Sequence, residues 1–322
     1  MIPEIKFDTY ADHLATEYLE QFIARGGSAV KVAVVPDGDT AGALRDAILV
    51  RANDQDFVTV AIDAAATQIN MLQQMFFVVA GQLDWAGYAR RVVESLIAGV
   101  YGQAVGGATT IDAVAEITDE DSMLVSLTLK KALAHRVIKN YELAKDFRIA
   151  MLQLCLAELQ PELFTAEGRD VILEWLNGRL RLISALKEQL IFHKVARHNA
   201  HSMFTSAARW VHQAGHPGLF LVLDVRQLAV PRRADADERV YYTPAALADA
   251  FEILRQFIDA TDEMAHLMLL VIAPSELLDE GSKRGFATYQ ALRNRIWDDV
   301  RDRSRVNPSA PMVRVATVRG SA

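Results

Sequence analysis

A short stretch near the amino terminus has the layout of a phosphate-binding loop. Residues 32–49 read VAVVPDGDTAGALRDAIL, an apolar β-type run followed by a small-residue turn (36–42) and a helix-forming run. This order is that of the Walker A site, G-x-x-x-x-G-K-[ST], whose amides, lysine and hydroxyl hold a triphosphate and its magnesium ion. In the best register its eight positions are Pro36, Asp37, Gly38, Asp39, Thr40, Ala41, Gly42 and Ala43.

The residue types in this register depart from that chemistry. Gly42 stands at the lysine position and Ala43 at the Ser/Thr position. Asp37 and Asp39 add two carboxylates, which would repel a triphosphate. The stretch therefore predicts a nucleotide-hydrolase fold that does not hydrolyse nucleotide, with no cofactor expected and ATP–magnesium binding weak at best.

A second stretch fits the Walker B strand of the same chemistry. Residues 218–224 read GLFLVLD, an apolar run that ends in Asp224, where such a strand places its magnesium-binding aspartate. Hydrolytic members place a water-polarising glutamate next, and this chain has Val225 there. Alone, the run is a weak signal, and a buried strand that ends in a turn aspartate explains it better. Together with the first stretch it favours the Walker B assignment.

A third stretch, residues 265–297, could carry an arginine that acts in a neighbouring subunit. Its apolar run ends near Ser275, without the Asn or Thr that usually senses the γ-phosphate. Arg293 and Arg295 lie on the helical run that follows and could stabilise phosphoryl charge in trans. The favoured interpretation is ion pairing on the surface with acids such as Asp298 or Asp299, because Arg295 and Asp299 have the i, i+4 spacing of a helical ion pair.

The remaining reactive residue types favour structural roles. His198 and His201 have a ligand-like spacing, but His193 does not and no carboxylate motif accompanies them, so no metal site is expected. Cys155 lies in an apolar helical run, which favours a buried thiol. The mixed-charge loop 232–239 is interpreted as a solvated loop that a partner could contact.

Composition limits the partners and the compartment. The chain of 322 residues is 51% hydrophobic and has 34 basic and 41 acidic residues, a net charge of −7. This balance argues against nucleic acid as the main partner. The start, MIPEIKFDTYADHL, does not resemble a signal peptide, and no apolar run reaches the roughly 20 residues that span a bilayer. A cytoplasmic location without membrane contact is expected, and the lone cysteine agrees with it.

The elements that would position these residues alternate as in a parallel α/β sheet. Five short apolar runs predict buried strands: 29–35, 57–62, 219–223, 267–273 and 312–318. Helices are expected at 8–25, 41–52, 244–260 and 287–303. Between the second and third strands, nearly every segment has helical apolar spacing: 85–100, 122–143, 144–159, 170–190 and 195–213. This predicts three parts: residues 1–62 and 218–322 as the two halves of the α/β core, and 63–217 as an α-helical insertion.

The chain resembles the P-loop ATP-binding protein family associated with bacteriophage-exclusion (BREX) systems. Order and spacing carry the resemblance across most of the chain, through these stretches: Gly26-Gly27-Ser28, Glu174-Trp175-Leu176-Asn177-Gly178, Arg197-His198-Asn199-Ala200, 218–224, Tyr242, 254–259, 273–276, 284–293 and Asn307-Pro308. The resemblance implies an AAA-like, additional-strand sheet in which the fifth and fourth strands flank the first. It places the nucleotide loop at 36–43 and the metal aspartate at Asp224.

Three functions remain open on this basis. The first is a catalytically degenerate ATPase, a structural or regulatory subunit of a bacterial multi-protein complex such as a phage-defence system, assembled with itself or with an ATPase-type paralogue. The second is an active or ATP-binding NTPase with a non-standard loop, in which Lys31 or Arg45 replaces the missing lysine. The third is an interaction module whose helical insertion binds protein or, less favoured by the net charge, DNA.

Overall fold

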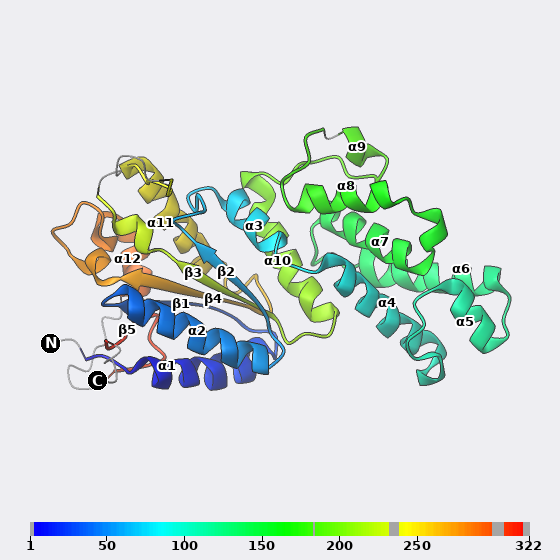
Figure 1. The fold of residues 1–322 in the computed structure, drawn as a ribbon, viewed down its shortest axis with the longest axis horizontal. Coiled ribbons are helices and arrows are strands. Elements are labelled where there is room, and N and C mark those ends of the chain that lie inside the picture. The colour runs from blue at the N-terminus through cyan, green and yellow to red at the C-terminus, as the bar shows by residue number, and fades with distance from the viewer. Residues whose placement is uncertain (1–2, 183, 232–237, 298–305, 318–322) are drawn as a thin grey trace. The chain divides into compact units, whose positions relative to one another are not determined.

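The chain folds into two compact units, one of which is inserted into the sequence of the other. A computed structural model describes residues 3–182, 184–231, 238–297 and 306–317. Contacts group residues 1–79 with 216–322, here called the sheet unit, and residues 80–215, here called the helical unit. The helical unit thus follows the second strand in the chain and precedes the third, as Figure 1 shows by colour.

Five parallel strands form one sheet within the described residues, as the apolar runs predict. Their order is β2-β3-β4-β1-β5, so β4 and β5 flank β1 as the resemblance implies. Close approach of strand ends explains one glycine: a Cβ on Gly218 would lie 2.6 Å from the carbonyl oxygen of His266. The strands are β1 (Ser28–Val35), β2 (Val58–Asp63), β3 (Leu219–Asp224), β4 (Leu267–Pro274) and β5 (Met312–Arg314).

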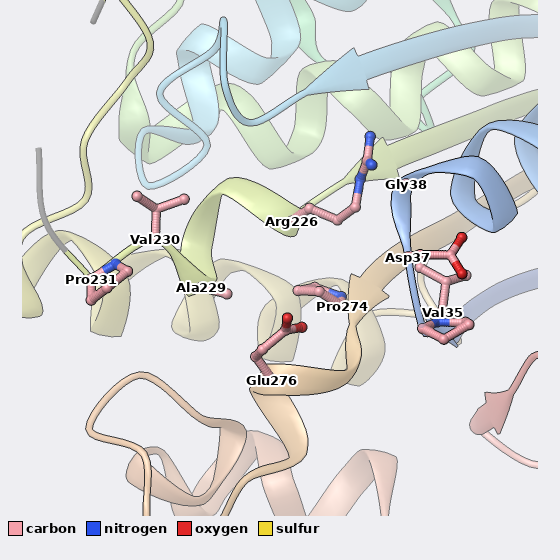
Figure 2. A pocket seen from close by; sticks show the side chains of 10 residues that line it. Val35, Asp37, Gly38, Arg226, Ala229, Val230, Pro231, Pro274 and Glu276 are labelled. Carbon is pink, nitrogen blue, oxygen red and sulfur yellow. The ribbon is translucent and has the colours of Figure 1, made fainter. Parts of the chain in front are cut away.

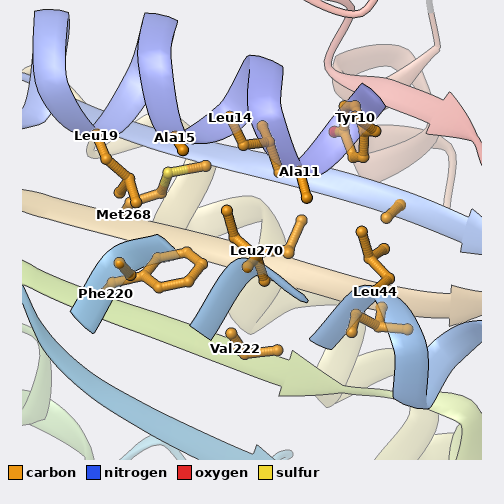
Figure 3. Packing of buried hydrophobic residues seen from close by; sticks show 14 of the residues in the cluster. Tyr10, Ala11, Leu14, Ala15, Leu19, Leu44, Phe220, Val222, Met268 and Leu270 are labelled. Atoms are coloured by element: carbon orange, nitrogen blue, oxygen red, sulfur yellow. The ribbon is translucent and has the colours of Figure 1, made fainter. Parts of the chain in front are cut away.

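Two helical segments cover one face of this sheet. Helix α1 (Phe7–His13) continues into a π-helical segment (Leu14–Ile23), which confirms the helix expected at 8–25. Helix α2 (Gly38–Asp54) presents an apolar stripe to the same face, because Ala41, Leu44, Ile48 and Ala52 recur every three or four residues. These side chains belong to one buried cluster with residues of the sheet, and Figure 3 shows Leu44 of α2 and Leu14 of the π-helical segment on the helix side of it. The sheet residues labelled there are Phe220, Val222, Met268 and Leu270.

Helices α11 (Pro244–Asp259) and α12 (Gln290–Ile296) lie on the other face of the sheet, where α11 contacts β1 (Figure 1). Thr243 caps α11, since its hydroxyl accepts a 3.2 Å hydrogen bond from the Ala246 amide, and Pro244 occupies the first helical position. The helix expected at 287–303 is shorter in the structure, and residues 298–303 lie outside the described part.

The helical unit contains most of the expected helices, with two breaks. The segment 122–143 ends its regular helix at Leu133 and continues as a π-helical turn (Ala134–Ile138). The segment 170–190 breaks after Leu176, because Gly178 adopts a positive φ of 69° that ends a helix. Helix α3 (Leu72–Ala80) leads into the unit. Its helices are α4 (Trp85–Tyr101), α5 (Ile111–Thr118), α6 (Ser122–Leu133), α7 (Lys145–Leu159), α8 (Ala166–Leu176), α9 (Ser184–Lys187) and α10 (Arg197–Gln213).

An aromatic core holds the helical unit together. Phe147 of α7 makes edge-to-face contacts with Trp85 of α4 and Trp210 of α10, at centroid distances of 5.8 and 6.5 Å. Each of these rings is at most 2% exposed. Across both units, none of the helices in the described part of the chain has the length and apolarity needed to cross a membrane.

Candidate functional site

A cavity of about 400 Å³ lies at the carboxyl edge of the sheet, where β1, β3 and β4 end. This is the edge at which parallel α/β sheets bind ligands. Figure 2 shows Asp37 and Gly38 on one side of the cavity and Val230 and Pro231 on the other, with Glu276 below. The fold therefore brings three parts of the chain to one place: the Walker A-like stretch 32–49, the residues that follow the Walker B-like strand 218–224, and the end of the strand in the stretch 265–297.

The connection between β1 and α2 is too short to be a phosphate loop. Only Pro36 and Asp37 separate the two elements, so six of the eight predicted loop positions are helical. The turn expected at 36–42 and the helix start expected at 41 are wrong. The cause is a capping interaction, in which the Asp37 carboxylate accepts a 2.7 Å hydrogen bond from the Thr40 amide and starts the helix early.

Capping also fixes charge at this helix end. Hydrogen bonds from Thr40 lower the pKa of Asp37, so its carboxylate stays ionised. A helix amino terminus favours an anion, and here a side chain of the protein supplies it. A bound phosphate would have to compete with Asp37 for the same amide groups.

Asp224 lies at the end of β3, as predicted, and is held by an arginine that sequence reasoning missed. The Arg226 guanidinium donates from Nε and Nη2 to the two carboxylate oxygens of Asp224, with distances of 2.7–3.0 Å. The backbone amide of Arg226 adds a 3.0 Å bond to Oδ1. These hydrogen bonds raise the pKa of Arg226. The sequence pattern that could have revealed Arg226 is the Asp-x-Arg spacing directly after an apolar strand.

Arg226 also reaches the start of α2. A Cβ built on Gly38 would lie 2.8 Å from its Nη1 atom, so the guanidinium lies against the first residue of the helix. Val225, between Asp224 and Arg226, is fully buried, and its amide donates to the Ile272 carbonyl at 2.9 Å. Val225 therefore continues the sheet edge and offers no group to polarise water.

The donor set does not match what magnesium–ATP requires. A triphosphate needs cations and free amides, and the magnesium aspartate must be accessible to the metal water shell. Here Asp37 and Glu276 contribute negative charge to the cavity, and the guanidinium of Arg226 already pairs with Asp224. Binding the ion at Asp224 in the usual way would require this pair to separate.

The two lysine substitutes considered from sequence lie elsewhere. Lys31 is 6% exposed, and its Nζ donates to the carbonyls of Ser309 and Ala310 at 2.6 and 3.3 Å. Arg45 forms an exposed pair with Asp46, 3.0 Å from Nε to Oδ1. Neither lines the cavity. Among its described lining residues, Arg226 is the cationic one.

The two candidate trans-acting arginines are engaged in ion pairs of the sheet unit. Arg293 Nη2 lies 2.6 Å from Glu280 Oε1, and Arg295 Nη2 lies 2.9 Å from Asp259 Oδ2. The acids suggested by spacing, Asp298 and Asp299, lie outside the described residues, as does most of the loop 232–239. A role of either arginine in a neighbouring subunit stays a prediction.

The histidines and the cysteine have local structural contacts. His193 Nδ1 lies 2.8 Å from Asp146 Oδ2, and Cys155 is fully buried with its Sγ 3.8 Å from the Ala89 carbonyl. Burial raises the pKa of Cys155, which keeps the thiol protonated. In the ranges that the structure describes, no three His, Cys, Asp or Glu residues come together as a metal site would need.

The fold and the position of the cavity define the class of protein. A parallel sheet of order β2-β3-β4-β1-β5, with an aspartate at the end of β3 beside the start of α2, is that of a P-loop NTPase-like, AAA-like α/β protein. A family model described as "BREX system ATP-binding protein BrxC/D" matches residues 19–321, and the chain belongs to this family. Neither the curated proteins nor the solved structures gave a match. The predicted family is thus confirmed.

Proposed function

We propose that this protein is a structural or regulatory component of a BREX-type phage-defence complex and does not itself hydrolyse ATP. Membership of the family supports the defence role. The observation that supports the lack of ATP hydrolysis is the ion pair at the site, in which two side-chain nitrogens of Arg226 bind the carboxylate of Asp224. The protein keeps the AAA-like sheet as a scaffold for assembly with an ATPase-type paralogue or with further copies of itself.

Three features of the site support this proposal together. The short β1–α2 connection removes the loop that would wrap the phosphates, and Asp37 occupies the helix start. Gly42 and Ala43 supply neither the lysine nor the hydroxyl of the motif. Val225 replaces the water-polarising glutamate. Each loss alone weakens triphosphate binding or turnover, and together they remove the lysine, the hydroxyl and the glutamate that the motifs use for these two steps.

The test is a calorimetric titration of the full chain with ATP and magnesium, together with a phosphate-release assay. We expect no turnover above the buffer rate and no magnesium-dependent binding in the micromolar range. Asp224→Asn is the matched variant, and it should behave as the wild type in both assays. Micromolar binding with turnover that Asp224→Asn abolishes would contradict the proposal.

One observation favours a second candidate, nucleotide binding without hydrolysis. Arg226 lies at the start of α2, where it could turn from Asp224 to a phosphate oxygen. The family description includes ATP binding, which agrees with this candidate. It predicts magnesium-independent ATP binding that Arg226→Ala abolishes and Arg45→Ala leaves unchanged. The same titration, repeated without magnesium, separates the two candidates.

A further inference from the structure

Helix α6 carries an exposed apolar face that the fold does not cover. Met123, Leu124 and Leu127 are 81%, 54% and 67% exposed. The opposite face of the same helix is fully buried, through Val125, Leu129 and Leu133. The helix thus meets its own unit with one apolar face and presents a second apolar face outwards.

Charged residues bracket this exposed face with opposite signs. Asp119, Glu120 and Asp121 come directly before the helix, and Lys130 and Lys131 lie in its last turn; all five are exposed. The lysines belong to the apolar face, because Met123, Leu127 and Lys130 are spaced by four and three residues, and Leu124, Leu127 and Lys131 by three and four. One surface therefore runs from acidic through apolar to basic.

This charge order makes the surface complementary to itself. When two copies of α6 lie antiparallel about a two-fold axis at Val125–Ser126, Leu124 of each copy faces Leu127 of the other. The same operation brings the acidic end of each copy to the basic end of the second copy, with Glu120 at the level of Lys131. A two-fold interface requires such self-complementarity. A lipid or nucleic-acid surface would be repelled by the acidic end.

We propose that the α6 face, residues 119–131, is the interface of a homodimer of this chain with antiparallel α6 helices. The helix has 12 residues and is about 18 Å long. An interface built on it is at the small end of specific interfaces, below about 1,200 Å² in total. The dimer is therefore weak and concentration-dependent. Figure 1 shows α5 beside α6, so the turn between them, with its acidic residues, adjoins the same surface.

Analytical ultracentrifugation of the full chain over a concentration series tests the apolar part. The wild type should show a monomer–dimer equilibrium, and Leu127→Asp should weaken it by at least about tenfold, because a charge would face an apolar surface. Leu163→Asp is the matched control, since Leu163 lies in the same unit, is 68% exposed and is not part of the face. A monomeric wild type, or equal weakening by both variants, would overturn the proposal.

A charge exchange tests the antiparallel arrangement. Glu120→Lys and Lys131→Glu should each weaken self-association, because like charges then meet at both ends of the interface. An equimolar mixture of the two variants should form a heterodimer at least as stable as the wild-type dimer, since both ends are again complementary. Glu120 is used because Asp121 caps α6 through the amides of Met123 and Leu124. Failure of the mixture to associate would exclude this arrangement, whatever the outcome of the nucleotide titration.

Discussion

The two parts of strand β3 are stabilised in different ways. From Leu219 to Leu223 it is at most 1% exposed and packs through apolar side chains. At its end, Asp224 depends on a guanidinium that is 38% exposed. The apolar stretch belongs to the architecture, whereas the polar end belongs to the site. The difference explains why the sheet does not depend on the residues at its polar end, because the burial that forms the sheet does not involve them.

The largest expected effect comes from the apolar side of this contrast. Phe220 is fully buried between the sheet and the helices of one face. Phe220→Ala should lower the free energy of unfolding by about 3–5 kcal/mol, through lost burial and the cavity left behind. Urea unfolding followed by circular dichroism measures the change.

An exposed phenylalanine of the same unit provides the control. Phe22 is 47% exposed, so Phe22→Ala should cost less than about 1 kcal/mol. If both substitutions destabilise the chain equally, the apolar core around β3 does not have the dominant role described above.

A smaller effect is expected at the polar end of the strand. Arg226→Ala leaves the carboxylate of Asp224, whose side chain is 12% exposed, with only the backbone amide of residue 226 among its described donors. This should cost about 1–3 kcal/mol. Adding Asp224→Asn should recover part of this loss, because a neutral amide tolerates the site better than an unpaired carboxylate. A double-mutant cycle on the free energy of unfolding measures the coupling.

The exposed pair of Arg45 and Asp46 is the reference for that cycle. Its two side chains are 41% and 68% exposed, and Arg45→Ala should change stability by less than about 1 kcal/mol. If the coupling energy between Asp224 and Arg226 is no larger than that of the reference pair, the ion pair does not close Asp224 to a metal ion. The proposal that Asp224 is closed to magnesium would then lose its basis.

The same contrast explains what sequence could predict. Continuous apolar runs identify buried strands because burial on both faces leaves little choice of residue, and the five runs were found within a few residues. Order and spacing sufficed for the family. The start of α2 was missed because the cap at Asp37 competes with the loop of the motif, and pattern matching does not weigh that competition. Arg226 was missed because its importance comes from the position of its guanidinium above Gly38, which only the folded chain defines.

The smallest effect concerns ionic contacts that support the architecture away from the site. Glu252 of α11 accepts hydrogen bonds from Arg255 at 2.5 and 2.7 Å and from the Tyr289 hydroxyl at 2.6 Å. These bonds lower its pKa from 4.5 to about 2, with the contact to Arg255 as the main cause. The carboxylate therefore stabilises the fold at neutral pH, and Glu252→Gln should cost about 1–2 kcal/mol there.

The pH dependence of this difference distinguishes the charge from the packing of the side chain. A carboxylate with a depressed pKa contributes its stability above the unfolded value, and the contribution is lost as the pH falls from about 4.5 towards about 2. The stability difference between wild type and Glu252→Gln should shrink across this window, whereas that of Phe220→Ala, which involves no titrating group, should not. Glu280→Gln, at the exposed pair with Arg293, is the control for a general effect of acid. If the stability difference for Glu252→Gln stays constant across this pH window, the charge of Glu252 does not contribute. Its contacts then stabilise the fold through packing alone, as those of Phe220 do.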